Sequence, residues 1–150
     1  MSKDSTVTFV LTVDNACSLD EVTLVTASDL PDTTYYIETP AVTTTYTSAF
    51  THTNTACPLV FSLTEDSAAY SAAFITNFDT ATGIITISTD SLTFDKVSKT
   101  LAITCTSQYS SHGNAAQTDS FVLTLKDECW DSVLTAPVLT ATYTWDLWAQ

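Results

Sequence analysis

Apolar and polar side chains alternate along most of this chain with a period of two, the spacing of a β-strand that is buried on one face. Residues 6–13 show the pattern clearly, because β-branched and aromatic residues dominate them. Similar runs follow at residues 22–25, 34–38, 42–46, 59–63, 73–76, 83–89, 100–106, 120–126 and 138–145. Turn residues separate these runs, and no segment has the period of an amphipathic helix. The pattern predicts an all-β, antiparallel sandwich or barrel of about ten short strands.

Two connections stand out between the predicted strands. Residues 79–83, which end on Gly83, predict a turn that leads into the strand after it. Residues 107–118 form the longest polar stretch, so we expect them to be an exposed connection between two long strands.

One internal repeat divides the chain. Residues 9–17 match residues 121–129 at five of nine positions, including Phe-Val-Leu-Thr and the cysteine, at an offset of 129 − 17 = 112 residues. Residues 22–24 and 34–38 are echoed more loosely by 133–135 and 142–146. A period of about 112 residues is the size of one Ig-like domain. We therefore expect 1–17 to resemble the end of one repeat, 18–129 to be a β-sandwich domain, and 130–150 to resemble the start of the next. The alternative is chance similarity between strands.

Composition narrows the classes of partner. The chain has 150 residues and a formal net charge of −13, with four lysines and no arginine. Nucleic-acid binding is excluded because phosphate recognition needs Lys and Arg, and an anionic membrane surface would repel the chain. No apolar run approaches the ~20 residues of a membrane span. The 31 threonines and 16 serines must supply most of the polar surface, since charged residues are only 14%.

Four cysteines in an acidic, Thr-rich chain favour disulfides and an oxidising, extracellular compartment. They are Cys17, Cys57, Cys105 and Cys129. Three pairings remain open, of which we favour Cys17–Cys57 and Cys105–Cys129 because these close the shorter loops. Free buried thiols are the alternative, and the wide spacing argues against a metal site. The start of the chain lacks a signal-peptide profile, so we expect residue 1 not to begin the primary product. The chain has no Asn-x-Ser/Thr site, and any glycan would be O-linked.

Several motifs carry a family resemblance over roughly residues 20–129. They lie at residues 59–63, 74–79, 82–86, 101–104 and 121–127. With these motifs the chain resembles cadherin-like and Ig-like repeats of extracellular surface proteins, above all the dystroglycan-type cadherin-like repeats found in tandem in ciliate protists. The resemblance implies an antiparallel Ig-like/cadherin-like β-sandwich, here with extended N- and C-terminal strands. It also implies an adhesion, spacer or surface-coat module rather than an enzyme.

Candidate chemistry is sparse. His52 and His112 are expected at exposed loop positions, and the chain has no Gly-x-Ser-x-Gly motif, no Cys/His pair and no phosphate-binding loop. No cofactor is expected. Cadherins bind calcium between domains, which makes acids near the repeat boundaries candidate ligands, although they form no recognisable cadherin motif. Ordinary solvated turn acids are the alternative. These acids are Asp14, Asp20, Glu21, Asp127, Glu128 and Asp131.

The three tryptophans all fall in the last 21 residues. A strand there would carry Tyr143, Trp145, Leu147 and Trp148, which either pack on their own domain or bury in the next subunit. We favour the interface. The expected function is a secreted structural subunit that assembles head to tail with copies of itself into a filament or surface coat. The alternative is an adhesion or carbohydrate-binding module of a longer tandem-repeat protein.

Overall fold

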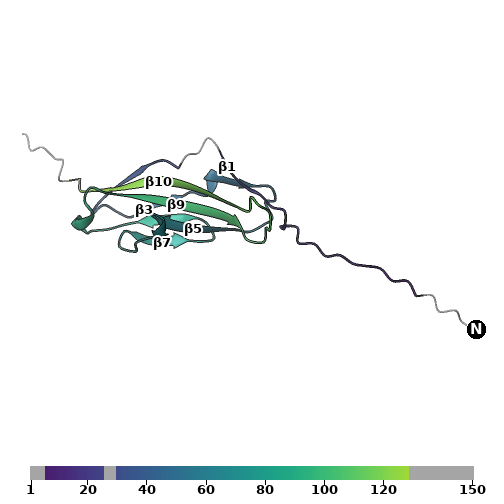
Figure 1. The fold of residues 1–150 in the computed structure, drawn as a ribbon. Coiled ribbons are helices and arrows are strands. Elements are labelled where there is room, and N and C mark those ends of the chain that lie inside the picture. Colours follow the sequence, from purple (N-terminus) through teal and green to yellow (C-terminus); the bar gives the residue numbers. More distant parts are fainter. Residues whose placement is uncertain (1–5, 26–29, 129–150) are drawn as a thin grey trace, which may run out of the picture.

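A computed structural model describes residues 6–25 and 30–128 of the chain (Figure 1). Its strands are β1 (Val22–Leu24), β2 (Thr33–Tyr36), β3 (Val42–Thr45), β4 (Phe50–His52), β5 (Leu59–Glu65), β6 (Ala68–Ala69), β7 (Ile75–Asp79), β8 (Ile84–Ile87), β9 (Val97–Ser107) and β10 (Ala116–Lys126). Two single turns of 3-10 helix, η1 (Thr47–Ala49) and η2 (Leu92–Phe94), complete the regular structure. The described residues contain no α-helix, which confirms the prediction of a β fold for this part of the chain.

The strands form three sheets. A five-stranded sheet has the order β2-β10-β9-β5-β6, a three-stranded sheet has the order β3-β8-β7, and β1 pairs with β4. Most pairs are antiparallel, and the longest is the hairpin of β9 and β10. However, β2 runs parallel to β10, so the prediction of wholly antiparallel sheets is wrong. These two strands lie far apart in the sequence, and no tight turn forces them into opposite directions.

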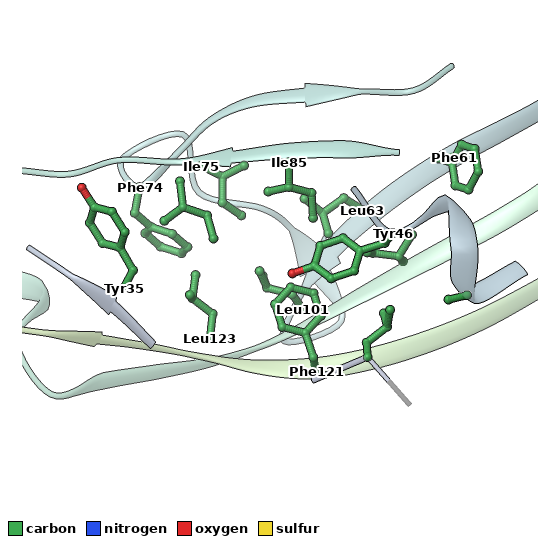
Figure 2. Packing of buried hydrophobic residues seen from close by; sticks show 14 of the residues in the cluster. Tyr35, Tyr46, Phe61, Leu63, Phe74, Ile75, Ile85, Leu101, Phe121 and Leu123 are labelled. Carbon is green, nitrogen blue, oxygen red and sulfur yellow. The ribbon is translucent and has the colours of Figure 1, made fainter. Parts of the chain in front are cut away.

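The core lies where the five-stranded and three-stranded sheets face each other (Figure 2). In β10 the side chains of Phe121, Leu123 and Leu125 are buried, while the residues between them are not. Aromatic rings cross between the elements, with centroids 4.9 Å apart for Tyr46 and Phe121. A slip of one residue in β10 would turn its buried face outward, so the apolar alternation fixes the register of this strand.

The turn into β8 forms as the sequence predicts. The backbone N–H of Ala81 donates to Asp79 Oδ1 at 2.8 Å, and the N–H of Gly83 donates to the Asp79 carbonyl at 2.8 Å. Gly83 has φ +65°, and a Cβ there would lie 3.1 Å from the ring of Phe61. Both the left-handed backbone and the close ring therefore favour glycine at this position.

Other boundaries differ from the prediction. Strands β4 and β6 were not predicted, because two or three residues carry too little periodicity to identify. The expected connection at 107–118 is shorter, since β9 continues through Ser107 and β10 begins at Ala116. At its start Ser107 pairs with Leu59 of β5, and at its end Gln117 and Thr118 pair with residues of β9.

Candidate functional site

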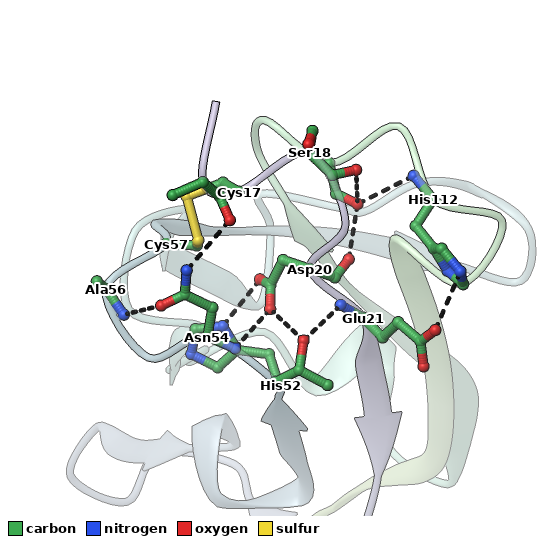
Figure 3. Close-up of polar contacts among 12 residues, drawn as sticks. Cys17, Ser18, Asp20, Glu21, His52, Asn54, Ala56, Cys57 and His112 are labelled. Atoms are coloured by element: carbon green, nitrogen blue, oxygen red, sulfur yellow. Dashed lines mark hydrogen bonds and ion pairs between the residues drawn. A yellow bond between two sulfur atoms is a disulfide. The ribbon is translucent and has the colours of Figure 1, made fainter. Parts of the chain in front are cut away.

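The carboxylate of Asp20 makes three polar contacts at the end of the folded body (residues 18–25 and 30–128) where the N-terminal segment (residues 6–17) leaves it (Figure 3). The Asp20 side chain is fully buried. Its Oδ2 lies 3.0 Å from His52 Nδ1, and its Oδ1 accepts hydrogen bonds from the Thr53 hydroxyl at 3.0 Å and the Asn54 N–H at 2.8 Å. One carboxylate thus holds the segment before β1 against the end of β4.

The charge of this carboxylate is stabilised despite its burial. Burial by itself raises the pKa of Asp20, but contacts with Ser107, His52, the Asn54 N–H and Thr53 outweigh it. The net effect holds the pKa of Asp20 well below its usual value. Asp20 is therefore an ionised structural anchor, and its lone pairs are already used by the fold.

The backbone around Asp20 is tied to the loop between β9 and β10. Ser110 Oγ donates to the Asp20 carbonyl at 2.6 Å, and the N–H of Ser111 donates to the Ser18 carbonyl at 3.0 Å. The N–H of Val22 donates to the Asn114 carbonyl at 2.9 Å. These contacts place the turn at residues 16–19 and the start of β1 beside the loop that leads into β10.

Both histidines belong to this network. His52 lies in β4 with its side chain 13% exposed, so the expectation of an exposed loop position is wrong for this residue. His112 does lie in the loop after β9, and its Nε2 is 3.0 Å from Glu21 Oε1. The sequence could not place His52, because only the pairing of β4 with β1 brings it beside Asp20.

One of the favoured disulfides is formed. Cys17 and Cys57 are joined, with Cα atoms 5.6 Å apart. The second favoured pairing, Cys105–Cys129, is wrong: the Cys105 thiol is free and lies opposite Gln117 near the start of β10, whereas Cys129 follows the end of that strand in the sequence. Cys105 carries a free, fully buried thiol in β9, and burial together with the nearby Asp20 charge raises its pKa to about 11.

Residues 6–13 were expected to be a strand, and in the structure they are extended but belong to none of the described sheets. Figure 1 shows them running away from the body at the end marked N. Their large apolar side chains are almost fully open to solvent, with Phe9 83% and Val10 93% exposed. An apolar strand with free backbone N–H and C=O groups is a template for pairing with another strand.

The candidate calcium ligands do not gather in one place. Asp14 is exposed on the N-terminal segment and Asp20 is buried beside His52, whereas Asp127 follows β10 at its far end. An eleven-residue strand spans about 33 Å from its first residue to its last, so these ends cannot share one ion within a chain. Within the described ranges no group of three or more His, Cys, Asp or Glu side chains could hold a metal ion. Asp131 lies outside these ranges.

The predicted interface residues Tyr143, Trp145, Leu147 and Trp148 also lie outside the described residues. No pocket is found in the structure as described, and none of its helices is long and apolar enough to cross a membrane. No family model matches the chain, and a search of curated proteins finds no match either. The described residues therefore form one packed set of sheets, from which an exposed apolar segment, residues 6–13, extends.

Proposed function

We propose that the chain is a non-enzymatic structural subunit of an extracellular filament or surface coat, whose copies join head to tail through their terminal segments. The observation that carries this proposal is the extended apolar segment 6–13, which leaves one end of a well-packed body with its side chains in solvent. Burying such a segment against another copy removes apolar surface from water, which is the main driving force of association.

The positions of the two chain exits support a linear assembly. Ser18 contacts the loop that precedes β10, whereas Lys126 ends β10 roughly 33 Å away, given about 3.3 Å per residue. Each copy therefore receives one neighbour at one end and presents its C-terminal part at the other. Contacts of this head-to-tail kind generate open filaments unless the rotation closes a ring.

A disulfide and several hydrogen bonds attach the N-terminal segment to the body, so a force applied to the segment would reach the sheets. The disulfide links Cys17 to Cys57, directly before β5, and Asn54 Nδ2 donates to the Ala16 carbonyl at 3.3 Å. Asp20 adds a buried anchor three residues after the disulfide. A pull on residues 6–16 therefore reaches the five-stranded sheet through a covalent bond instead of peeling β1 from its partner.

For the fold we propose an Ig-like or cadherin-like β-sandwich over 18–129. In support, a short early strand, β2, runs parallel to the last strand, β10, while the remaining pairs are antiparallel. The outer face is rich in hydroxyls that meet across strands, as Thr104 and Thr118 do at 2.7 Å. Such a surface suits an exposed extracellular module and offers acceptors for O-linked glycans. The formed disulfide agrees with an oxidising compartment.

Electron microscopy and sedimentation of the purified full chain test this function together. We expect fibres or long oligomers whose length grows with protein concentration, since each added copy exposes a new end. If the chain stays monomeric at high concentration with the Cys17–Cys57 disulfide intact, the proposal is refuted.

The internal repeat favours a second candidate, a module from a longer tandem array that serves in adhesion or carbohydrate binding. Among the described residues the exposed tyrosines Tyr36 and Tyr109 lie at different places, one in β2 and one in the loop after β9. They therefore form no shared platform for stacking on a sugar. Glycan-array binding by monomeric protein, without fibres, would support this candidate over the filament.

A further inference from the structure

The exposed segment carries the sequence of β10, and this likeness identifies its inward face. Residues 9–12 are identical to residues 121–124, and the β10 positions equivalent to Phe9, Leu11 and Val13 are at most 2% exposed. In the N-terminal segment these three side chains are 83%, 76% and 83% exposed. The segment thus has the apolar face of a last strand and lacks the neighbours that cover β10.

The structure also shows which strand lies beside a last strand of this sequence. In the body β2 runs parallel to β10, with Thr34 opposite Thr124 and Tyr35 opposite Leu125. Beyond the ladder, the N–H of Ile37 donates to the Lys126 carbonyl at 2.9 Å. Tyr35 and Ile37 are both buried, so this short pair contributes two large side chains to the core.

Residues 142–146 repeat the alternation of residues 34–38, with Tyr143 in the place of Tyr35 and Trp145 in the place of Ile37. We propose that residues 141–144 of one copy pair in parallel with residues 11–14 of the next copy, in the register of β2 and β10. This inference rests on the proposed head-to-tail assembly and names its joint. In this register Thr142 lies opposite Thr12, and Tyr143 lies opposite Val13. Residues 141–146 are outside the described ranges, so they enter through their sequence alone.

The register brings matching faces together. In the observed pair the side chains of Tyr35 and Leu125 are buried on the same face of the sheet. By the same geometry Tyr143 and Trp145 cover the face that carries Phe9, Leu11 and Val13. In this register Thr142 takes the place of Thr34, whose side chain is exposed in β2. The sequence therefore provides an aromatic half and an aliphatic half for one buried joint.

The dimensions of the body favour a second copy over closure within one chain. Lys126 lies roughly 33 Å from the start of β10, and the extended chain from Leu11 to Cys17 spans a further ~20 Å at about 3.3 Å per residue. The fifteen residues from Lys126 to Ala141 reach at most ~54 Å. Residues 141–144 could reach residues 11–14 of their own chain only if the linking residues were fully extended, whereas residues 141–144 of a neighbouring copy need no such extension.

Mixing two blocked full-length variants tests the joint. Leu11→Asp with Val13→Asp blocks the N-terminal half, and Tyr143→Asp with Trp145→Asp blocks the C-terminal half, because each places charge on the inward face. Neither variant should form fibres by itself. Mixed together they should form a heterodimer of about twice the monomer mass in sedimentation, and no longer species, because only one joint can form. The matched control is Thr6→Asp with Thr8→Asp, which places the same charge on the outward face, outside residues 11–14, and should still assemble.

The outcomes separate this joint from the function on which it rests. A monomeric wild-type chain removes the proposed function and the joint with it. If the wild type forms fibres and either blocked variant forms fibres as well, the filament stands but this joint is overturned. The same holds if the wild type forms fibres and the mixture of the two blocked variants stays monomeric. Leu11 and Val13 are 76% and 83% exposed, so thermal unfolding of the N-blocked variant should match that of wild type and exclude misfolding as the cause.

The register has its own readout. Cysteines placed at Thr12 and Thr142 of the full chain should cross-link between copies on mild oxidation, because facing residues bring their Cα atoms within about 7 Å. The control pairs Thr12 with Thr144, which also points outward but lies about 7 Å further along the strand. Peptide mapping identifies which cysteines join. We expect the in-register pair to form at least roughly tenfold faster, and equal rates would overturn the register.

Discussion

Replacing Asp20 by asparagine tests whether one buried carboxylate holds the base of the N-terminal segment. Asp20 accepts three hydrogen bonds of 2.8 to 3.0 Å from His52, Thr53 and Asn54. Hydrogen bonds to a charged group contribute about 1.5–3 kcal/mol each, and asparagine can still accept the two bonds to Oδ1. The Asp20→Asn variant should therefore lose about 1–2 kcal/mol of unfolding free energy at neutral pH. Asp20→Ala should lose about 3–4 kcal/mol, because it removes both acceptor oxygens and so all three hydrogen bonds, while Thr53 can turn to water.

The pH dependence carries the sharper test. The folded pKa of Asp20 lies below its unfolded value of about 3.9, so its stabilising effect is complete well above that value. The effect is lost as the pH falls from about 5 toward the folded pKa, because the native carboxylate must then bind a proton. Urea unfolding followed by circular dichroism should show the gap between wild type and Asp20→Asn narrowing over that range. Asp90→Asn, which alters an exposed carboxylate, is the control and should change little at any pH. A gap that stays constant or widens in acid would refute the role of the Asp20 charge.

Three further predictions concern the body. Cys17→Ser with Cys57→Ser should cost about 4 kcal/mol of unfolding free energy in urea titrations, the loop-entropy value for a separation of 40 residues, and an unchanged midpoint would contradict the anchor. Since burial raises the pKa of the Cys105 thiol to about 11, a thiol reagent at mildly alkaline pH should label it only in denaturant, and rapid labelling of the native chain would contradict its burial. Gly83→Ala should cost about 1–2 kcal/mol in thermal unfolding, because it combines a left-handed backbone with a Cβ 3.1 Å from Phe61, and a neutral result would mean that the ring moves aside.

Strand composition predicted most of the fold because it is a local property. The runs that became β5, β8, β9 and β10 were recognisable since each alternates apolar and polar residues over four or more positions. The disulfide between Cys17 and Cys57 was one of three pairings, and loop length favoured it. Short β4 and β6 carried no such signal, and the parallel direction of β2 depends on a partner that lies some ninety residues later in the chain.

The candidate site divides in the same way. The apolar alternation of residues 6–13 and their likeness to β10 are visible in the sequence, but only the structure shows that those side chains lie in solvent. Asp20 and His52 are 32 residues apart, and the sequence predicts only a boundary acid and a loop histidine. Their contact arises because β1 and β4 pair, and burial then turns an ordinary acid into an anchor.

The sequence by itself therefore determined the all-β class, the acidic hydroxyl-rich surface and the repeated strand, because composition and periodicity are carried by neighbouring residues. Only the tertiary structure shows which of the two similar segments is buried and which is exposed to solvent. Residues 121–124 are packed between β2 and β9, whereas the identical residues 9–12 have no described neighbour, so the same four side chains form core in one place and an open edge in the other. Burial depends on what surrounds a segment, and that is set by contacts between residues far apart in the chain.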